Sequence, residues 1–144
     1  MRLEINGKDN ILLKLDLVND LVCHIGEFEI SARLGRIDNV FNILSNKISA
    51  ITRLEIKDFA DIICISLKYR FDWETIFNEA VQKDAWVNPL DVAKYFAELD
   101  AKKFELIAWI TPFKADDLKK YCDTIANDIV HGKANTLAIR ASHD

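Results

Sequence analysis

The sequence predicts a mainly α-helical domain with a small N-terminal β-hairpin. Apolar residues recur every three or four positions through most of the chain, which is the spacing of one helix face. Only four glycines and two prolines occur in 144 residues, so turn residues are too scarce for a many-stranded sandwich or barrel. Half of the residues are hydrophobic and 29% are charged, so a chain of this length can bury one core. We therefore expect one helical domain over residues 1–132, followed by a loose tail over residues 133–144.

The hairpin is predicted from two short extended runs, Arg2–Ile5 and Ile11–Leu15. Asn6 and Gly7 lie between these runs, and Asn-Gly is the strongest short sequence signal for a tight hairpin turn.

A first helix is predicted from Asp16 to Leu34. Asp16 can cap its start, and Gly35 follows at the position where a left-handed residue commonly ends a helix. Gly26 would weaken this helix by ~1 kcal/mol relative to Ala. The expected apolar face comprises Val18, Leu21, Val22, Ile25, Phe28 and Ala32.

Two further helices are predicted before residue 70. The first is short, covers Ile37–Leu44 and ends at Ser45, after which Asn46–Glu55 shows no clear pattern. The next runs from Asp58, as its cap, to Leu67, although its run of isoleucines also suits a strand. Acidic residues at its start and basic residues after its end match the sign of a helix dipole, which favours the helix.

The clearest helix starts are at Asp72 and Asn88. Asp72 can cap a helix from Trp73 to about Gln82. Asn88 precedes Pro89, and proline is favoured at the first helical position because its missing N–H has no intrahelical partner there. The buried stripe of this second helix is expected to comprise Leu90, Ala93, Phe96 and Ala97.

The C-terminal part predicts two more helices. After a break near Asp100, one runs through Phe104–Ile110 towards Pro112, and the last covers Ala115–His131 with Gly132 just past its end. The following residues show neither a cap nor a regular period, which predicts the loose tail. The expected core of the whole domain includes Leu21, Ile25, Phe41, Leu44, Ile62, Phe77, Phe96, Ile107 and Ile125.

Charge and hydropathy exclude several classes of protein. The net charge of −4 provides no basic surface for nucleic acid or an anionic membrane, so neither is expected as a partner. No stretch longer than eight residues lacks a charged side chain, so no transmembrane helix is expected. The first ten residues lack the apolar core of a secretory signal, and three unpaired, widely spaced cysteines suit a reducing compartment. We therefore expect a cytoplasmic protein.

We expect no catalytic residue, no cofactor and no metal site. The three histidines include no pair at helical spacing, so a zinc site would need distant ligands. Gly132 and Lys133 follow a helix, whereas a phosphate-binding loop precedes one. The alternative is a small helical enzyme or toxin-like protein that uses Cys122 or His131.

Aromatic residues are the candidates for binding a partner protein, because aromatic anchors are enriched at the centres of interfaces. The candidates are Trp86, Trp73, Trp109 and Phe113. Taken one at a time, each is better explained as an ordinary core residue. Trp86 lies between two polar breaks and is the best candidate for an exposed position.

The order of elements carries a resemblance to a known family. A hairpin leads into a helix that ends in Glu29–Gly35, a short helix follows, and then comes Lys57–Ile63. In this order roughly residues 2–82 resemble the tail assembly chaperones of long-tailed phages and related gene transfer agents. The half from Trp86 on departs from the smaller members of that family.

The resemblance implies a non-enzymatic protein that binds the tape measure protein, keeps its long hydrophobic helices in solution and recruits tail tube subunits. It also implies self-association and an exposed apolar or aromatic groove for a partner helix. An enzyme should instead group titratable residues around a concave pocket. A third hypothesis is an antitoxin or regulatory adaptor, which would also be helical and acidic.

Overall fold

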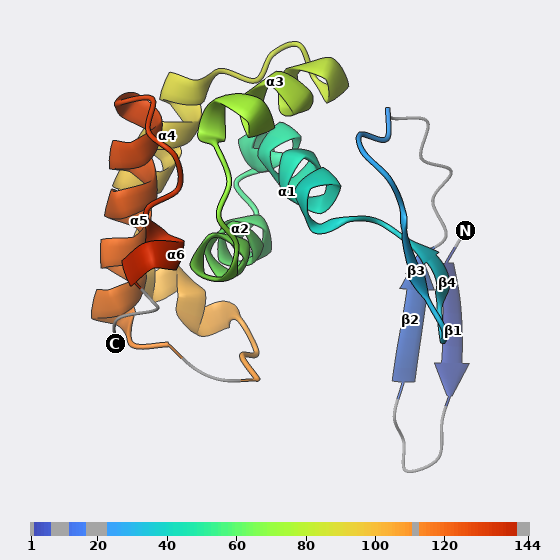
Figure 1. The fold of residues 1–144 in the computed structure, drawn as a ribbon. Helices are drawn as coiled ribbons and strands as arrows, with labels where there is room; N and C mark the ends of the chain where they lie inside the picture. The colour runs from blue at the N-terminus through green and yellow to red at the C-terminus, as the bar shows by residue number, and fades with distance from the viewer. Residues whose placement is uncertain (1, 7–11, 17–22, 111–112, 141–144) are drawn as a thin grey trace.

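The computed structural model describes residues 2–6, 12–16, 23–110 and 113–140, and it confirms a mainly α-helical fold with a small N-terminal β-hairpin. Two short hairpins lie at one side of a body of packed helices, next to the start of α1 (Figure 1). The elements are β1 (Arg2–Asn6), β2 (Leu12–Asp16), β3 (Glu29–Ser31), β4 (Gly35–Ile37), α1 (Val40–Ser49), α2 (Ile56–Lys68), α3 (Trp73–Lys83), α4 (Pro89–Glu98), α5 (Ala115–Val130) and α6 (Leu137–Arg140), with the 3-10 helices η2 (Ile51–Arg53) and η3 (Ala101–Leu106).

The predicted hairpin forms from β1 and β2, which pair antiparallel with Ile5 opposite Leu13 and Glu4 opposite Lys14. The Lys14 ammonium lies 3.7 Å from the Glu4 carboxylate across the strands. Leu3, Ile5 and Leu13 lie on the other face of the pleat and remain 39 to 51% exposed. This hairpin therefore keeps an apolar face that is only half covered.

The prediction of a helix from Asp16 to Leu34 is wrong over residues 23–34, and its first part lies outside the described residues. Residues 29–37 instead form the antiparallel hairpin of β3 and β4, with Ser31 opposite Gly35. Gly26 and Gly35 both have positive φ, and the Ser31 hydroxyl accepts from two backbone N–H groups of the turn. The Ser31 bonds stabilise the turn in competition with helical backbone bonds. Ile30 is exposed, so no burial of its side chain favours a helix here.

The next two helices are present and longer than predicted, but the predicted start of the first is wrong because Ile37 belongs to β4. The first, α1, begins after Asn39, whose side chain caps it, and continues through Ser45 to Ser49 because Ser45 and Ile48 are buried on its inner face. The second, α2, begins two residues before Asp58, which confirms a helix rather than a strand here. Asp58 itself is buried and binds Lys47 instead of capping.

The predicted helix starts at Asp72 and Asn88 are confirmed. The Asp72 side chain accepts from the Glu74 N–H, and the Asn88 side chain accepts from the Leu90 N–H. The end of α5 is also as predicted, since Gly132 follows it with φ +60°. The expected helix through Phe104–Ile110 is wrong: only η3 forms, and residues 107–110 lie outside any helix.

The core of the helical body contains most of the predicted residues. Leu44, Ile62, Phe77, Phe96 and Ile125 are all buried. The remaining predicted core residues differ: Ile25 and Ile107 are half-buried, Phe41 is 36% exposed, and Leu21 lies outside the described residues. In the expected stripe of α4, Ala93 and Phe96 are buried as predicted, whereas Leu90 and Ala97 are exposed, because Val92 faces the core instead.

The prediction of a loose tail from Lys133 is wrong for residues 133–140. The Asn135 side-chain amide donates to the carbonyls of Ser66 (2.7 Å) and Tyr69 (2.8 Å) at the end of α2. Leu137 is 1% exposed and begins α6, which packs on α2 (Figure 1). The Thr136 N–H also donates to the Asp128 carboxylate of α5 at 2.9 Å, and the Asn135 N–H donates to the Phe71 carbonyl. Single polar contacts of this kind produce no periodic sequence pattern. Residues 141–144 lie outside the described residues.

Candidate partner-binding groove

The four aromatic residues predicted to bind a partner do not form one site. Trp73 is 1% exposed, Trp86 is 89% exposed, and Trp109 and Phe113 are half-buried. Only the last two contact each other, with ring centroids 5.1 Å apart in an edge-to-face arrangement. Trp73, Trp86 and the pair of Trp109 with Phe113 are therefore described separately.

Trp73 is a core residue. Its ring packs edge-to-face on Phe71, with centroids 4.8 Å apart, and lies 6.2 Å from Phe77. The prediction that Trp73 contacts a partner is wrong, because its side chain is buried inside the protein.

Trp86 is exposed on a short, well-anchored turn between α3 and α4. The Asp84 carboxylate accepts from the Trp86 N–H at 3.0 Å, and the next residue, Val87, is buried and donates to the Asp84 carbonyl. A fixed backbone thus presents an exposed indole to solvent.

Trp109 and Phe113 form an aromatic wall beside α2. The Trp109 indole N–H donates to the Phe104 carbonyl at 3.1 Å, so its polar atom is satisfied within the protein. Phe113 also contacts Tyr121 of α5 edge-to-face at 6.2 Å. The wall is therefore held from η3 and from α5, while apolar ring surface remains for contact with another molecule.

A groove of about 680 Å³ lies between this wall and α2. Apolar and aromatic side chains make most of it, with charged residues only on the α2 side. Its lining residues are Lys57, Ala60, Asp61, Cys64, Leu67, Lys68, Ile107, Ala108, Trp109, Ile110 and Phe113. A second hollow of about 290 Å³ lies against Trp109 and Phe113 as well, between η3 and α5.

Small and apolar residues of α2 form the floor of the groove. Ala60, Cys64 and Leu67 are three or four positions apart and therefore share one helix face. Burial, and then the nearby Asp61 carboxylate, raise the pKa of the Cys64 thiol. The thiol therefore remains neutral at pH 7, so the floor carries no charge at this point.

The carboxylate in the groove is already paired. The Lys47 ammonium lies 2.8 Å from both Asp61 and Asp58. Burial by itself lowers the pKa of Lys47, but hydrogen bonds to the two carboxylates outweigh this and raise it. Asp61 is therefore ion-paired from the side of α1, whereas Lys57 and Lys68 are the charged groove residues that form no ion pair with the described residues.

The α2 side of the groove was not predicted from the sequence. Lys57, Ala60, Cys64 and Lys68 lie on one face of a helix from which only Ile62 was included in the expected core. The sequence pattern that could have indicated it is a helix face with small residues in the middle and a lysine at each end.

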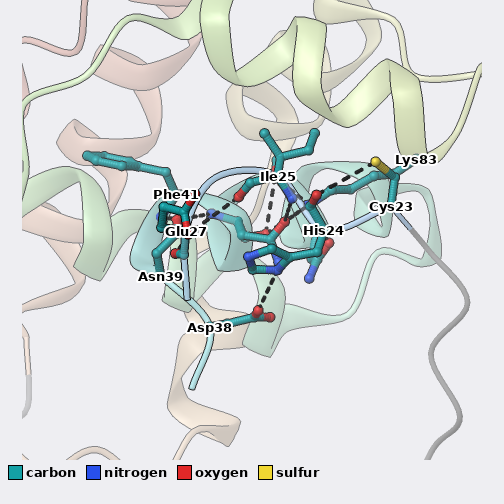
Figure 2. Close-up of polar contacts among 11 residues, drawn as sticks. Cys23, His24, Ile25, Glu27, Asp38, Asn39, Phe41 and Lys83 are labelled. Carbon is teal, nitrogen blue, oxygen red and sulfur yellow. Dashed lines mark hydrogen bonds and ion pairs between the residues drawn. The ribbon is translucent and has the colours of Figure 1, made fainter. Parts of the chain in front are cut away.

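A second polar cluster joins residues 23–27 to α1 (Figure 2). The Asn39 side-chain amide donates to the carbonyls of Ile25 and Glu27, and the Asn42 side chain accepts from the Ile25 N–H. His24 pairs with Asp38, with 2.9 Å between Nδ1 and Oδ1. This cluster attaches the β-strand region to the helical body.

The residues of the enzyme hypothesis are not brought together. Cys122 is 1% exposed, and burial raises the pKa of its thiol to about 12, so it is not a thiolate at neutral pH. His131 is exposed, and its Nδ1 lies 2.8 Å from the Asn127 carbonyl of its own helix. His131, the C-cap of α5, is nine positions after Cys122, which corresponds to about 13 Å along the helix axis.

Within the described ranges, no three His, Cys, Asp or Glu side chains converge as a metal site would require. None of the helices in that part of the chain has the length and apolarity to cross a membrane. Comparisons with protein-family models, curated protein sequences and solved structures give no significant match.

Proposed function

We propose that this protein is a non-enzymatic tail assembly chaperone that binds an apolar helical segment of a tape measure protein in the groove beside α2. The groove is the observation that carries the proposal. It is large enough for several partner side chains, and its aromatic wall supplies Trp109 and Phe113, two of the residues expected to bind a partner. Apolar grooves of this kind are typical sites for amphipathic helices.

An exposed apolar residue of the groove supports this function. Ile110 lines the groove and is fully exposed. Apolar side chains that remain in water favour binding, because each gains free energy when a partner removes it from water. The recruitment of tail tube subunits requires another surface, and exposed Trp86 is our candidate for it.

Co-expression with a tape measure protein tests this function. The amount of tape measure protein that stays in the supernatant is measured alone, with the native chain, and with the variants Ile110→Asp and Leu106→Asp. We expect the native chain to keep the partner in solution and Ile110→Asp to lose much of this effect. Leu106→Asp is the matched control, because Leu106 is exposed and apolar but does not line the groove.

If the native chain leaves the tape measure protein in the pellet, the proposed function is wrong. If both variants act like the native chain, the groove is not the binding site.

A further inference from the structure

The groove follows the axis of α2. Its α2 residues, from Lys57 through Ala60 and Cys64 to Lys68, recur every three or four positions, so they form one stripe along the helix. Lys57 and Lys68 are eleven residues apart, which corresponds to about 16 Å, or three helical turns. An occupant that fills the groove must therefore extend over about three turns.

The floor and the wall favour a helix as the occupant. All of the groove's α2 residues belong to a helix whose backbone bonds are internal, so that side has no free strand edge to extend. A segment that enters an apolar groove must satisfy its own backbone N–H and C=O groups, as a helix does. The small side chains of Ala60 and Cys64 allow a second helix to approach α2 closely.

The charges at the two ends of the groove indicate which charges a bound helix should carry. Lys57 and Lys68 are both exposed, and neither ammonium forms an ion pair with the residues that the structure describes. The single carboxylate between them, Asp61, is held by Lys47. The groove is therefore apolar in the middle and positive at both ends.

We propose that the groove selects a helix whose apolar stripe has a carboxylate at each end, eleven residues apart, with one carboxylate beside Lys57 and the other beside Lys68. This inference rests on the proposed function, since it concerns the same groove. An apolar helix with basic ends would place like charges together and bind more weakly. Charge position thus adds selectivity to a groove whose affinity comes from apolar contact.

Three synthetic helical peptides test this selectivity. They share one apolar stripe and differ only at two positions eleven residues apart, which are both Glu, both Gln or both Lys. Binding to the full chain is measured by fluorescence anisotropy of the labelled peptide at low and high salt. We expect the Glu peptide to bind roughly 2- to 30-fold more tightly than the Gln peptide, the range given by two exposed ion pairs. The Lys peptide should bind most weakly, and salt should reduce these differences.

A charge-reversed chain supplies the second measurement. In the double variant Lys57→Glu with Lys68→Glu, the preference should invert, so that the Lys peptide binds best. The control is Lys102→Glu with Lys103→Glu, which makes the same change in net charge at exposed residues that do not line the groove. That control should keep the native order of the three peptides.

The outcomes separate the two proposals. If all three peptides bind the native chain equally, or if the control variant inverts the preference, the charge selectivity is wrong while the groove remains a binding site. If none of the peptides binds the folded native chain, the groove does not hold apolar helices, and the proposed function is contradicted as well.

Discussion

Two clusters of aromatic residues with similar composition have different surroundings in this protein. In the first cluster, Phe71 and Phe77 pack against Trp73, which is 1% exposed. Trp109 and Phe113 form a half-buried wall with a hollow on each side. The difference teaches that aromatic residues stabilise the fold where other side chains surround them completely, and remain available to a partner where the packing is incomplete.

The largest effect is expected from Trp73→Ala in the filled cluster. Removing a fully buried tryptophan leaves a cavity, so the free energy of unfolding should fall by about 3–5 kcal/mol. Urea denaturation followed by circular dichroism measures this loss. A loss below about 1 kcal/mol would show that this cluster is not a packed core.

The second largest effect expected is on the pH dependence of stability, and it compares two thiols, Cys122 in the core and Cys64 in the groove floor. The pKa of Cys122 is about 12 in the folded chain against an ordinary value of 9.0. Above pH 9 the unfolded chain loses this proton and the folded chain keeps it, so stability falls as pH rises from 9 towards 12. The slope reaches about 1.4 kcal/mol per pH unit for one such group.

Denaturation between pH 8 and pH 10.5 measures this slope in the native chain and in Cys122→Ala. The variant should lose stability more slowly as pH rises, whatever its stability at pH 8. Cys64→Ala is the matched control and should change the slope in the same direction by less, because Cys64 is less buried. Equal slopes in the native chain and Cys122→Ala would contradict the difference between the two surroundings.

The helical body was more predictable from the sequence than the N-terminal region, and burial explains why. In α3 and α4, the caps Asp72 and Asn88 coincide with apolar faces that reach the core, so local and tertiary preferences agree. In residues 23–34 the apolar spacing suggested a helix, but Phe28 of its expected apolar face is 36% exposed and Leu34 at its end is 71% exposed. Periodicity predicts a helix only where the apolar face is buried.

The aromatic wall of the groove was predicted from the sequence, but its α2 side was not, for a related reason. Trp109 and Phe113 were singled out as residue types, whereas Cys64 and Lys68 belong to a helix face that is covered in part and open in part. A sequence pattern shows which residues share a face but not which part of it another element covers. Asn135 is a similar case, because its two bonds to α2 are made across 69 and 66 positions of the chain.

The third effect is expected from Trp109→Ala in the open cluster. A half-buried indole should contribute about 1–2 kcal/mol to stability, less than Trp73, because part of its surface is already in water. Affinity for an apolar helical peptide should fall at least tenfold, since the variant removes half of the aromatic wall. Denaturation and peptide anisotropy together separate the two effects, and unchanged affinity in a folded variant would remove Trp109 from the groove site.

The smallest effect on stability is expected from Trp86→Ala, which changes a tryptophan outside both clusters. Its side chain is 89% exposed, and its turn is held by Asp84 and Val87, so the free energy of unfolding should change by less than about 0.5 kcal/mol. Peptide affinity of the groove should stay at the native value, because Trp86 does not line it. Acrylamide should quench the native fluorescence more strongly than that of the variant, because the most exposed indole is gone. If the affinity fell as far as in Trp109→Ala, Trp86 would belong to the groove site after all, and the separation of the exposed indole from the aromatic wall would be wrong.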